Sequence, residues 1–300
     1  MTKIKKIDIH AHATMFPQYA PITPTGYTMV SAETLIDFYD KLNVEYGVLL
    51  PIASPECQYF DQMSSETCKA LTVAHPDRLL WFCGVDPRSC GNKPSADFSG
   101  ILSHYKSLGA KGLGELTSQL YTDDPLVDNL FRQCAEQGLP VTIHIAPKFG
   151  DYYGIVDELG LPRLEKMLKK HKDLIILGHS QPFWAEISDN ASDENRVGYP
   201  EGKVREGRLQ KLLREYPNLY CDLSANSGAN ALLRDRDHAA RFIEEFSDRI
   251  LYGCDICSPK NVHSFKLEEF LDGMLSDGSL SLENYEKLVR KNAERILGLN

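Results

Sequence analysis

The sequence lacks several features that would place it in other classes of protein. Its 300 residues contain no run approaching the roughly 20 consecutive apolar residues that cross a bilayer. The amino terminus, MTKIKKIDIH, passes directly into a strand-like pattern without an apolar segment or a small-residue cleavage site, so we expect no signal peptide. Positive charge is in the minority, with 33 lysines and arginines against 42 acidic residues and a net charge of −9. This balance argues against nucleic acid and membrane surfaces as partners.

The sequence also lacks low-complexity stretches, internal repeats and a cysteine pattern typical of a disulfide framework. Its eight cysteines are scattered, and Cys83, Cys221 and Cys254 fall inside apolar, strand-like runs where a thiol behaves as a small hydrophobe. A chain of this length with 42% hydrophobic residues can bury a core without covalent staples. We therefore expect reduced thiols and a cytoplasmic location.

Short β-branched runs alternate with amphipathic stretches along the whole chain. The strand-like runs are Ile4–His12, Val44–Ile52, Leu79–Val85, Ala110–Leu116, Leu139–Ile145, Leu174–His179, Leu219–Leu223 and Ile250–Ile256. The helix-like segments are Ser31–Leu42, Gln62–His75, Ala96–Leu108, Asp124–Gln137, Leu161–His171, Gly207–Tyr216, Asp237–Phe246 and Leu267–Leu275, with a final helix over Leu282–Leu297. Ser31 precedes Glu33 and an apolar face, which is typical of a helix start, and Gly109 and Gly138 follow predicted helix ends.

The runs are apolar on both faces, as in VEYGVLL and LIILG, which is typical of parallel strands covered on both sides. Eight strand–helix units in about 260 residues fit a single (β/α)8 TIM barrel of the α/β class spanning residues 1–300. A doubly wound open sheet is the alternative, but it usually has fewer strands and a glycine-rich loop after the first. Here the first strand ends in His-Ala-His instead.

Two connections, Ala13–Val30 and Gln181–Val204, are unusually long. They follow the first and sixth predicted strands, at the end of a barrel where active sites are built. We therefore expect both loops to lie at the end of the barrel that carries a site.

Histidines and acids recur at the ends of the predicted strands. His10 and His12 are two residues apart on the first strand, so their imidazoles share one face and can hold a borderline divalent metal. Asp8 shares that parity one layer deeper. The other strand-end residues are Glu115, His144, His179 and Asp255, from the fourth, fifth, sixth and eighth predicted strands. Strand ends of a barrel converge, so the sequence predicts a metal site there.

These segments resemble the amidohydrolase superfamily, and specifically the amidohydrolase-related branch that includes aminocarboxymuconate-semialdehyde decarboxylase-like enzymes. The matching stretches are IDIHAHA, GAKGLGELT, VTIHIAP, LIILGHS, ILYGCDI and VRKNAERILGL, in order from near Ile4 to Leu299. The resemblance implies a metal-dependent hydrolase or lyase on a distorted barrel. It implies that His10, His12, His144 and Asp255 are metal ligands, and that His179 is a second-site ligand or a catalytic histidine.

Glu115 departs from the pattern of many two-metal members, which carry a carboxylated lysine at the end of the fourth strand. Lys111 opens this strand and Glu115 closes it, so a glutamate bridge is an alternative, as in the TatD-like nucleases. The continuation typical of those nucleases is missing, since the chain reads GELTSQL. We expect Glu115 to bind or lie near metal, and leave open whether one ion binds or two.

The ligand types suggest zinc, with manganese as an alternative. Such a cation acidifies bound water and polarises a substrate carbonyl. Asp255 is the candidate general base, and His179 is a candidate to stabilise the charge that develops on the carbonyl oxygen. Trp184, on the second long loop, is a candidate substrate contact. Cys254-x-x-Cys257 imitates a redox motif, but Cys254 sits within a strand rather than at a helix start, so we expect ordinary thiols.

Two activities follow from this reading. The favoured one is hydrolysis of a small carbonyl compound (an amide, lactone or other ester), and the alternative is non-oxidative decarboxylation of an aromatic or unsaturated acid. A decarboxylase needs a cation facing the substrate carboxylate, and the rim loops offer few beyond Arg88, Arg196 and Lys148. A barrel that keeps metal without turnover is the least favoured reading. We expect a small-molecule substrate and allow for a homodimer through the Leu282–Leu297 segment.

Overall fold

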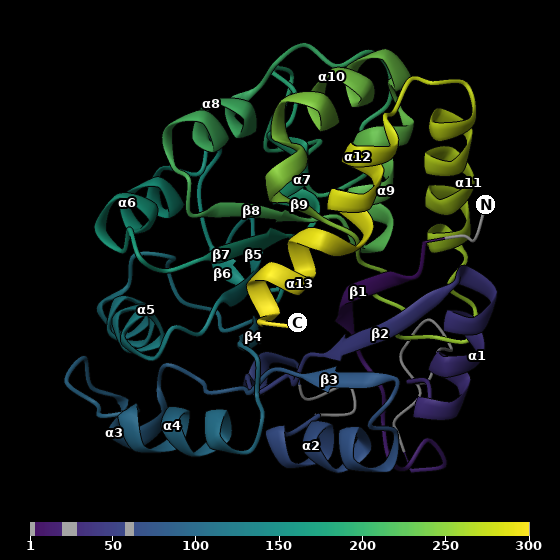
Figure 1. The fold of residues 1–300 in the computed structure, drawn as a ribbon. Helices are drawn as coiled ribbons and strands as arrows, with labels where there is room; N and C mark the ends of the chain where they lie inside the picture. Colours follow the sequence, from purple (N-terminus) through teal and green to yellow (C-terminus); the bar gives the residue numbers. More distant parts are fainter. Residues whose placement is uncertain (1–3, 20–28, 58–62, 300) are drawn as a thin grey trace.

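The structure is a computed structural model that describes residues 4–19, 29–57 and 63–299, and its strands form a ring (Figure 1). The ring strands are β1 (Lys6–Ala11), β2 (Val44–Leu49), β3 (Leu79–Trp81), β4 (Leu113–Leu116), β5 (Val141–Ala146), β7 (Ile176–His179), β8 (Leu219–Asp222) and β9 (Ile250–Leu251). All neighbouring strands pair in parallel, in the orders β1-β2-β3 and β4-β5-β7-β8-β9. Each lies within one of the eight predicted runs except β5, which extends one residue further, to Ala146.

Backbone hydrogen bonds join the two sheets at both seams and close the barrel. Between β3 and β4, Cys83 donates its amide to the Gly112 carbonyl at 2.8 Å and accepts from the Gly114 amide at 3.0 Å. Between β9 and β1, the Ile9 amide donates to the Tyr252 carbonyl at 3.1 Å. The predicted TIM barrel is confirmed, and the open-sheet alternative is excluded.

Helices follow the strands and cover the outside of the ring. They are α1 (Ala32–Leu42), α2 (Ser65–Ala74), α3 (Ser89–Asn92), α4 (Ser99–Ser107), α5 (Pro125–Gln137), α6 (Pro162–Lys170), α7 (Gln181–Ala185), α8 (Arg208–Glu215), α9 (Ala225–Leu233), α10 (Arg236–Phe246), α11 (His263–Ser276), α12 (Leu282–Glu286) and α13 (Asn292–Leu297). The Ser31 hydroxyl caps α1 by accepting from the Thr34 amide at 3.2 Å, as predicted. Gly138 ends α5 in the left-handed conformation, at φ 64°.

Four short elements were not predicted, because none carries a clear periodicity. They are α3, α7, α9 and the two-residue strand β6 (Ile155–Val156), which pairs with the end of β5. Helix α7 lies inside the second long connection, so part of that loop is ordered against the barrel. Residues 20–28 of the first long connection lie outside the described residues.

The carboxyl-terminal segment closes the end of the barrel opposite the predicted site. Figure 1 shows α12 and α13 lying across the ring, and a π-helical stretch (Lys287–Lys291) joins them. Ala293 and Leu297 of α13 pack on a cluster of residues from inside the strand ring, including Ile7 and Leu251. The apolar side chains of this segment are thus largely used within the chain, although Leu282 stays exposed. The homodimer remains a prediction.

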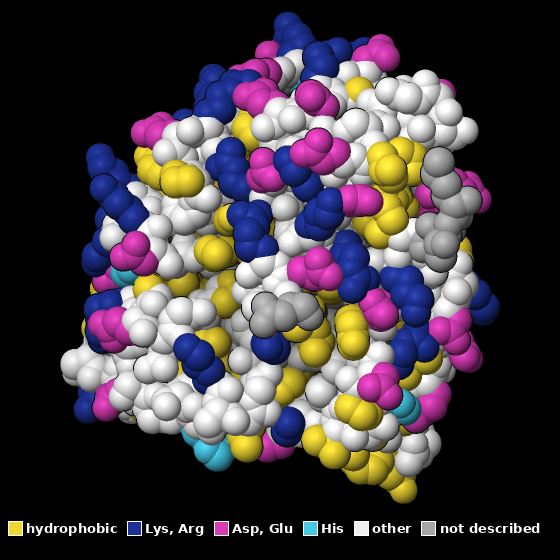
Figure 2. Space-filling view, viewed as in Figure 1, with side chains coloured by type: hydrophobic (Ala, Val, Ile, Leu, Met, Phe, Trp, Pro, Cys, Tyr) yellow, Lys and Arg dark blue, Asp and Glu magenta, His cyan; other side chains and the backbone are white. Residues whose placement is uncertain are grey.

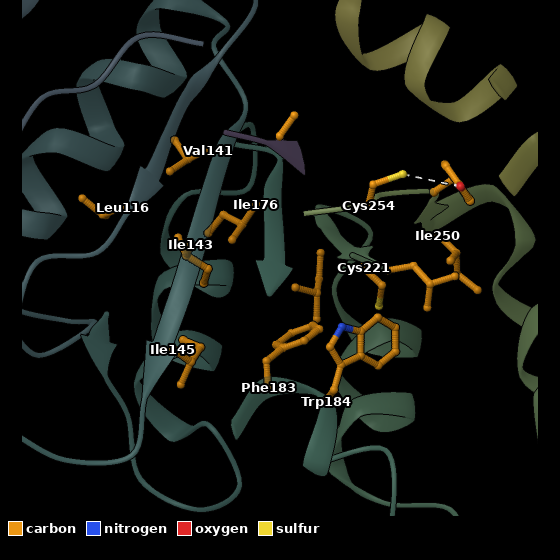
Figure 3. Close-up of a cluster of buried hydrophobic side chains, with 14 of the residues drawn as sticks. Leu116, Val141, Ile143, Ile145, Ile176, Phe183, Trp184, Cys221, Ile250 and Cys254 are labelled. Carbon is orange, nitrogen blue, oxygen red and sulfur yellow. Dashed lines mark hydrogen bonds between the residues drawn. The ribbon is translucent and has the colours of Figure 1, made fainter. Parts of the chain in front are cut away.

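Charges are mixed on the face that carries α12 and α13: lysine, arginine and acidic side chains alternate over it (Figure 2). In the described part of the chain, none of the helices has the length and apolar character that crossing a membrane requires. A second cluster of buried side chains fills the space between the strands and the outer helices (Figure 3). This packing leaves the carboxyl ends of the strands as the place where polar groups gather.

Candidate metal centre

The structure brings all six predicted strand-end residues together at the carboxyl ends of the barrel strands. Their candidate ligand atoms form overlapping groups in which every atom lies within 4.8 Å of the others. The groups are His10–His12–Glu115, His10–His179–Asp255 and Glu115–His144–His179. All six side chains are buried except Asp255, whose side chain is 19% exposed.

His10 of β1 and His12, the residue after the end of β1, direct their Nε2 atoms toward each other. These atoms lie 3.1 Å apart. The opposite ring nitrogens are occupied, because His10 Nδ1 lies 2.5 Å from Asp222 Oδ2 and His12 Nδ1 donates to the Leu50 carbonyl at 2.9 Å. Such partners place the proton on Nδ1 and leave a lone pair on Nε2. Two lone pairs at this separation require a cation or a proton between them.

Glu115 connects the His10–His12 pair to His144. One carboxylate oxygen lies 3.5 Å from His12 Nε2, and the other lies 2.7 Å from His144 Nδ1. The approach depends on Gly114, whose φ is 134° and where a Cβ atom would lie 2.7 Å from the Thr142 carbonyl oxygen. At Gly112 a Cβ atom would lie 2.6 Å from the Phe82 ring. Close packing at both positions therefore explains the Gly-Leu-Gly sequence.

His179, at the end of β7, and Asp255, after β9, complete the cluster. The His179 ring centroid lies 4.5 Å from that of His10, and its Nδ1 is 3.0 Å from the Ser224 hydroxyl. Asp255 has left-handed backbone, with φ 48°, and its amide donates to the His10 carbonyl at 2.8 Å. This turn brings Asp255 Oδ1 to 3.6 Å from His12 Nε2.

Sequence reasoning missed Asp222, at the end of β8. Its side chain is fully buried, contacts His10 through Oδ2, and accepts from the Ser224 amide at 3.0 Å through Oδ1. The same Oδ2 lies 3.6 Å from His179 Nδ1. The sequence did contain a signal for Asp222: it ends an apolar strand, and that strand supplied no residue to the predicted site.

Asp8 lies beneath the site and ties β1 to its neighbours. It accepts from the amides of His10 at 3.0 Å and Cys254 at 2.7 Å, and from the Tyr39 hydroxyl at 2.8 Å. Burial raises the pKa of Asp8 to about 7, and the three hydrogen bonds oppose that rise. Its role is to fix the backbone that carries His10.

Buried acids and imidazoles shift one another's pKa. Burial opposes the charged form of His10, but the carboxylates of Asp222, Asp255 and Glu115 outweigh it and raise the pKa of His10 well above its usual value. Burial alone would raise the pKa of Glu115, yet the neighbouring imidazoles lower it well below the ordinary range. Burial and the nearby His10 lower the pKa of His179 to about 4, so this ring is neutral at pH 7.

The donor set fits a divalent metal ion. Imidazole nitrogens and carboxylate oxygens are the usual ligands of zinc. Two nitrogens bound tetrahedrally to one zinc ion lie about 3.3 Å apart, given zinc–nitrogen distances of about 2.0–2.1 Å, and the Nε2 atoms of His10 and His12 are 3.1 Å apart. Buried carboxylates also demand a positive charge nearby. The cluster can therefore hold a metal.

The site opens into an inner pocket and two outer pockets. The inner pocket is lined by His12, Met29, Ile52, Cys57, Glu115, His144, Tyr153, His179, Asp255 and Cys257. The outer pockets add residues of the segments after β5, β7, β8 and β9, among them Tyr152, Gln181, Val197, Tyr199, Asn226 and Asn261. The second long connection thus contributes to the pocket walls.

No lysine or arginine is among the described residues that line these three pockets. The segments 20–28 and 58–62 contain neither residue type in their sequences. Arg88 is held by Glu56 and Asp86, at 2.8 Å and 2.7 Å from its Nη2, and Arg196 is fully buried. Lys148 lies 5.9 Å from the Tyr152 ring centroid.

Trp184 occupies a different place from the one predicted. Its side chain is 2% exposed, points into the core beside Phe183 and Cys221 (Figure 3), and does not line the inner pocket. Its indole nitrogen donates to the Asp222 carbonyl at 2.9 Å. The structure gives Trp184 a packing position behind β8, because α7 turns this part of the loop toward the barrel wall.

The two cysteines of the Cys254-x-x-Cys257 sequence have different surroundings. Cys254 is buried in the core, 3.5 Å from the Tyr252 hydroxyl (Figure 3), whereas Cys257 lines the inner pocket. Both are free thiols, as are the other six cysteines. That neither thiol has a redox or metal-binding role remains a prediction.

A parallel barrel with a histidine and carboxylate cluster at its strand ends defines a class of barrel proteins that can hold a metal ion at this end. Within that class, the chain belongs to the amidohydrolase family, whose model matches residues 7–299. The family resemblance drawn from the sequence motifs is confirmed. None of the curated proteins matches the chain.

Solved structures of similar fold cover nearly the whole chain. An uncharacterised TIM-barrel protein from Bordetella bronchiseptica is 17% identical, with a TM-score of 0.66 and coverage of 98% of this chain and 99% of the other. A 2,6-dihydroxybenzoate decarboxylase from Rhizobium is 17% identical, with a TM-score of 0.62 and 99% of each chain covered. A probable 2-pyrone-4,6-dicarboxylic acid hydrolase from Acinetobacter baumannii is 14% identical, with a TM-score of 0.60 and coverage of 99% and 100%. At these identities the likeness establishes the fold, which serves both hydrolases and decarboxylases.

Proposed function

We propose that this protein is a metal-dependent hydrolase of a small neutral carbonyl compound, such as an amide, lactone or other ester. The observation that carries the proposal is a buried cluster of four imidazoles and two carboxylates in a pocket without lysine or arginine among its described lining residues. With only a bound cation to supply positive charge, the pocket favours an uncharged substrate over a carboxylate.

His10, His12, Glu115, His144, His179 and Asp255 are the proposed ligands of one or two divalent ions, with zinc expected and manganese the alternative. When bound, such an ion supplies a Lewis acid that polarises a carbonyl and acidifies water. The neutral state of His179 favours its role as a ligand or hydrogen-bonding group over that of a proton donor.

Asp255 is the proposed general base, because it is the most exposed of the site's acids and faces the inner pocket. As the water oxygen attacks the carbonyl carbon, Asp255 takes one water proton and the C=O π pair moves onto the carbonyl oxygen. The pair then re-forms the carbonyl while the C–N or C–O bond breaks. The leaving nitrogen or oxygen keeps that bonding pair and accepts the proton from Asp255.

Decarboxylation of an aromatic or unsaturated acid is the second candidate. It is supported by the decarboxylases among the structures of similar fold, including a 5-carboxyvanillate decarboxylase from Sphingomonas paucimobilis that is 17% identical. The positions of Arg88 and Arg196, one paired with acids and the other buried outside the pockets, count against it. We further propose a cytoplasmic location, which the free thiols support.

A panel of neutral lactones, amides and aromatic acids, assayed with metal-loaded protein, tests the proposal. We expect turnover of a neutral ester or amide, with release of acid. If the protein released carbon dioxide from the aromatic acids and hydrolysed none of the lactones or amides, decarboxylation would replace hydrolysis as the proposed function. Elemental analysis of the purified protein, run in parallel, measures the identity and number of bound ions.

Asp255→Asn tests the proposed base. The variant should retain much of the bound metal, because an amide oxygen can still coordinate, while turnover falls by several orders of magnitude. Full activity in Asp255→Asn would remove Asp255 from the mechanism.

A further inference from the structure

Tyr153 lies where the inner pocket meets both outer pockets. Among the residues that the structure describes, it is one of two, with His144, that line all three. The centroids of the Tyr153 and His144 rings are 4.4 Å apart, so the tyrosine packs directly on a candidate ligand. No sequence pattern singles out Tyr153, which lies in an irregular segment after β5.

The short strand β6 fixes the position of Tyr153. Ile155 and Val156, which follow the tyrosine after one intervening residue, pair with the last two residues of β5. The intervening Gly154 donates its amide to the Thr117 carbonyl at 2.7 Å, and a Cβ atom there would lie 2.5 Å from the His144 carbonyl oxygen. The backbone is therefore held against two strand ends, which restricts where the ring can lie.

The inner pocket offers few neutral hydrogen-bond donors to a substrate. Four of its described lining side chains are apolar or bear thiols: Met29, Ile52, Cys57 and Cys257. Five others, His12, Glu115, His144, His179 and Asp255, belong to the candidate ligand set. Thiols are weak donors. Among the described lining residues, Tyr153 alone carries a hydroxyl.

We infer that Tyr153 is a further catalytic residue, whose hydroxyl donates a hydrogen bond to the substrate carbonyl oxygen and to the charge that develops on it during attack. This inference rests on the proposed hydrolysis. The π pair that moves onto the carbonyl oxygen is stabilised by a donor already in place, and the phenolic proton stays on Tyr153 throughout. The ring, packed on His144, sets the position of the hydroxyl.

Tyr153→Phe tests the hydroxyl while keeping the ring on His144. The variant should lose about 100-fold in kcat, as when one oxyanion donor is removed, with metal content and melting temperature unchanged and KM shifted less than about threefold. Tyr105→Phe is the matched control, because its hydroxyl contacts Glu66 on the outer helices at 2.6 Å. The control should keep wild-type kinetics.

Binding of acetohydroxamic acid to the metal-loaded protein gives a readout that does not need turnover. Tyr153→Phe should weaken this probe by about fivefold to tenfold, the usual value of one hydrogen bond, and Tyr105→Phe should leave it unchanged. If the wild type hydrolyses nothing in the panel, the proposed function fails and probe affinity alone decides the role of Tyr153. The inference would be overturned if kcat and probe affinity of Tyr153→Phe stayed within threefold of wild type in every assay in which the wild type gives a signal.

Discussion

Asp222→Asn probes how the chain prepares the site for a metal ion. In the wild type, Asp222 Oδ2 lies 2.5 Å from His10 Nδ1, and Oδ1 accepts from the Ser224 amide at 3.0 Å. The carboxylate thereby fixes the ring orientation of His10 and keeps its Nε2 lone pair directed at His12. An asparagine has one oxygen, so it can satisfy only one of these two donors.

The expected loss follows from this geometry. Removing a partner that orients a metal-binding histidine typically costs about 10-fold to 100-fold in metal affinity, or about 1.4–2.8 kcal/mol. Asp222 is fully buried and lies 3.6 Å from a second candidate ligand, His179. Both features place the expected loss near the upper end of that range.

The assay is a competition titration of metal-free protein with zinc and a chelating dye, which reports the dissociation constant directly. Asp37→Asn is the control, since it makes the same chemical change at an exposed position of α1. A folded Asp222→Asn protein that binds zinc as tightly as the Asp37→Asn control would refute the orienting role of Asp222.

Two further outcomes are expected. Glu115→Gln should lower the metal count per chain if Glu115 bridges two ions; an unchanged count by elemental analysis would indicate a single-ion site. Burial alone would raise the pKa of Asp235, but the Val204 amide, the Lys203 ammonium and the His238 amide lower it to about 2. A carboxyl group whose pKa is lowered by folding stabilises the folded state at pH values above its unfolded pKa, which is near 3.8. This stabilisation is lost as the pH falls toward 2. Asp235→Asn should therefore lower the free energy of unfolding by about 1 kcal/mol at pH 7, allowing for solvent screening at the exposed Lys203. Urea titrations should show that the difference in unfolding free energy between wild type and variant narrows below pH 4.

The charge pattern of the site is the physical basis for proposing a bound cation together with a neutral substrate. Glu115, Asp222 and Asp255 all act on the pKa of His10, and the described pocket walls supply no lysine or arginine to balance them. A bound divalent ion balances this charge and leaves little surplus for an anionic substrate. A positively charged side chain at the pocket mouth would be needed to reverse that preference.

Local sequence patterns were sufficient to predict the eight strands and most of the outer helices. Runs such as VEYGVLL and LIILG are apolar on both faces wherever a strand is covered on both sides, and this is a property of neighbouring residues. The same patterns placed His10, His12, Glu115, His144, His179 and Asp255 at strand ends. Because parallel strands in a barrel converge, their proximity followed from the fold class.

The sequence by itself therefore determined the barrel and the imidazoles and acids at its rim. Only the tertiary structure decided which side chains support them. Asp222 contacts His10 from 212 residues away, Tyr153 reaches His144 through the placement of a two-residue strand, and Trp184 turns into the core instead of the pocket. The physical reason is range: strand and helix patterns depend on residues a few positions apart, whereas these contacts depend on how distant segments close around one ring.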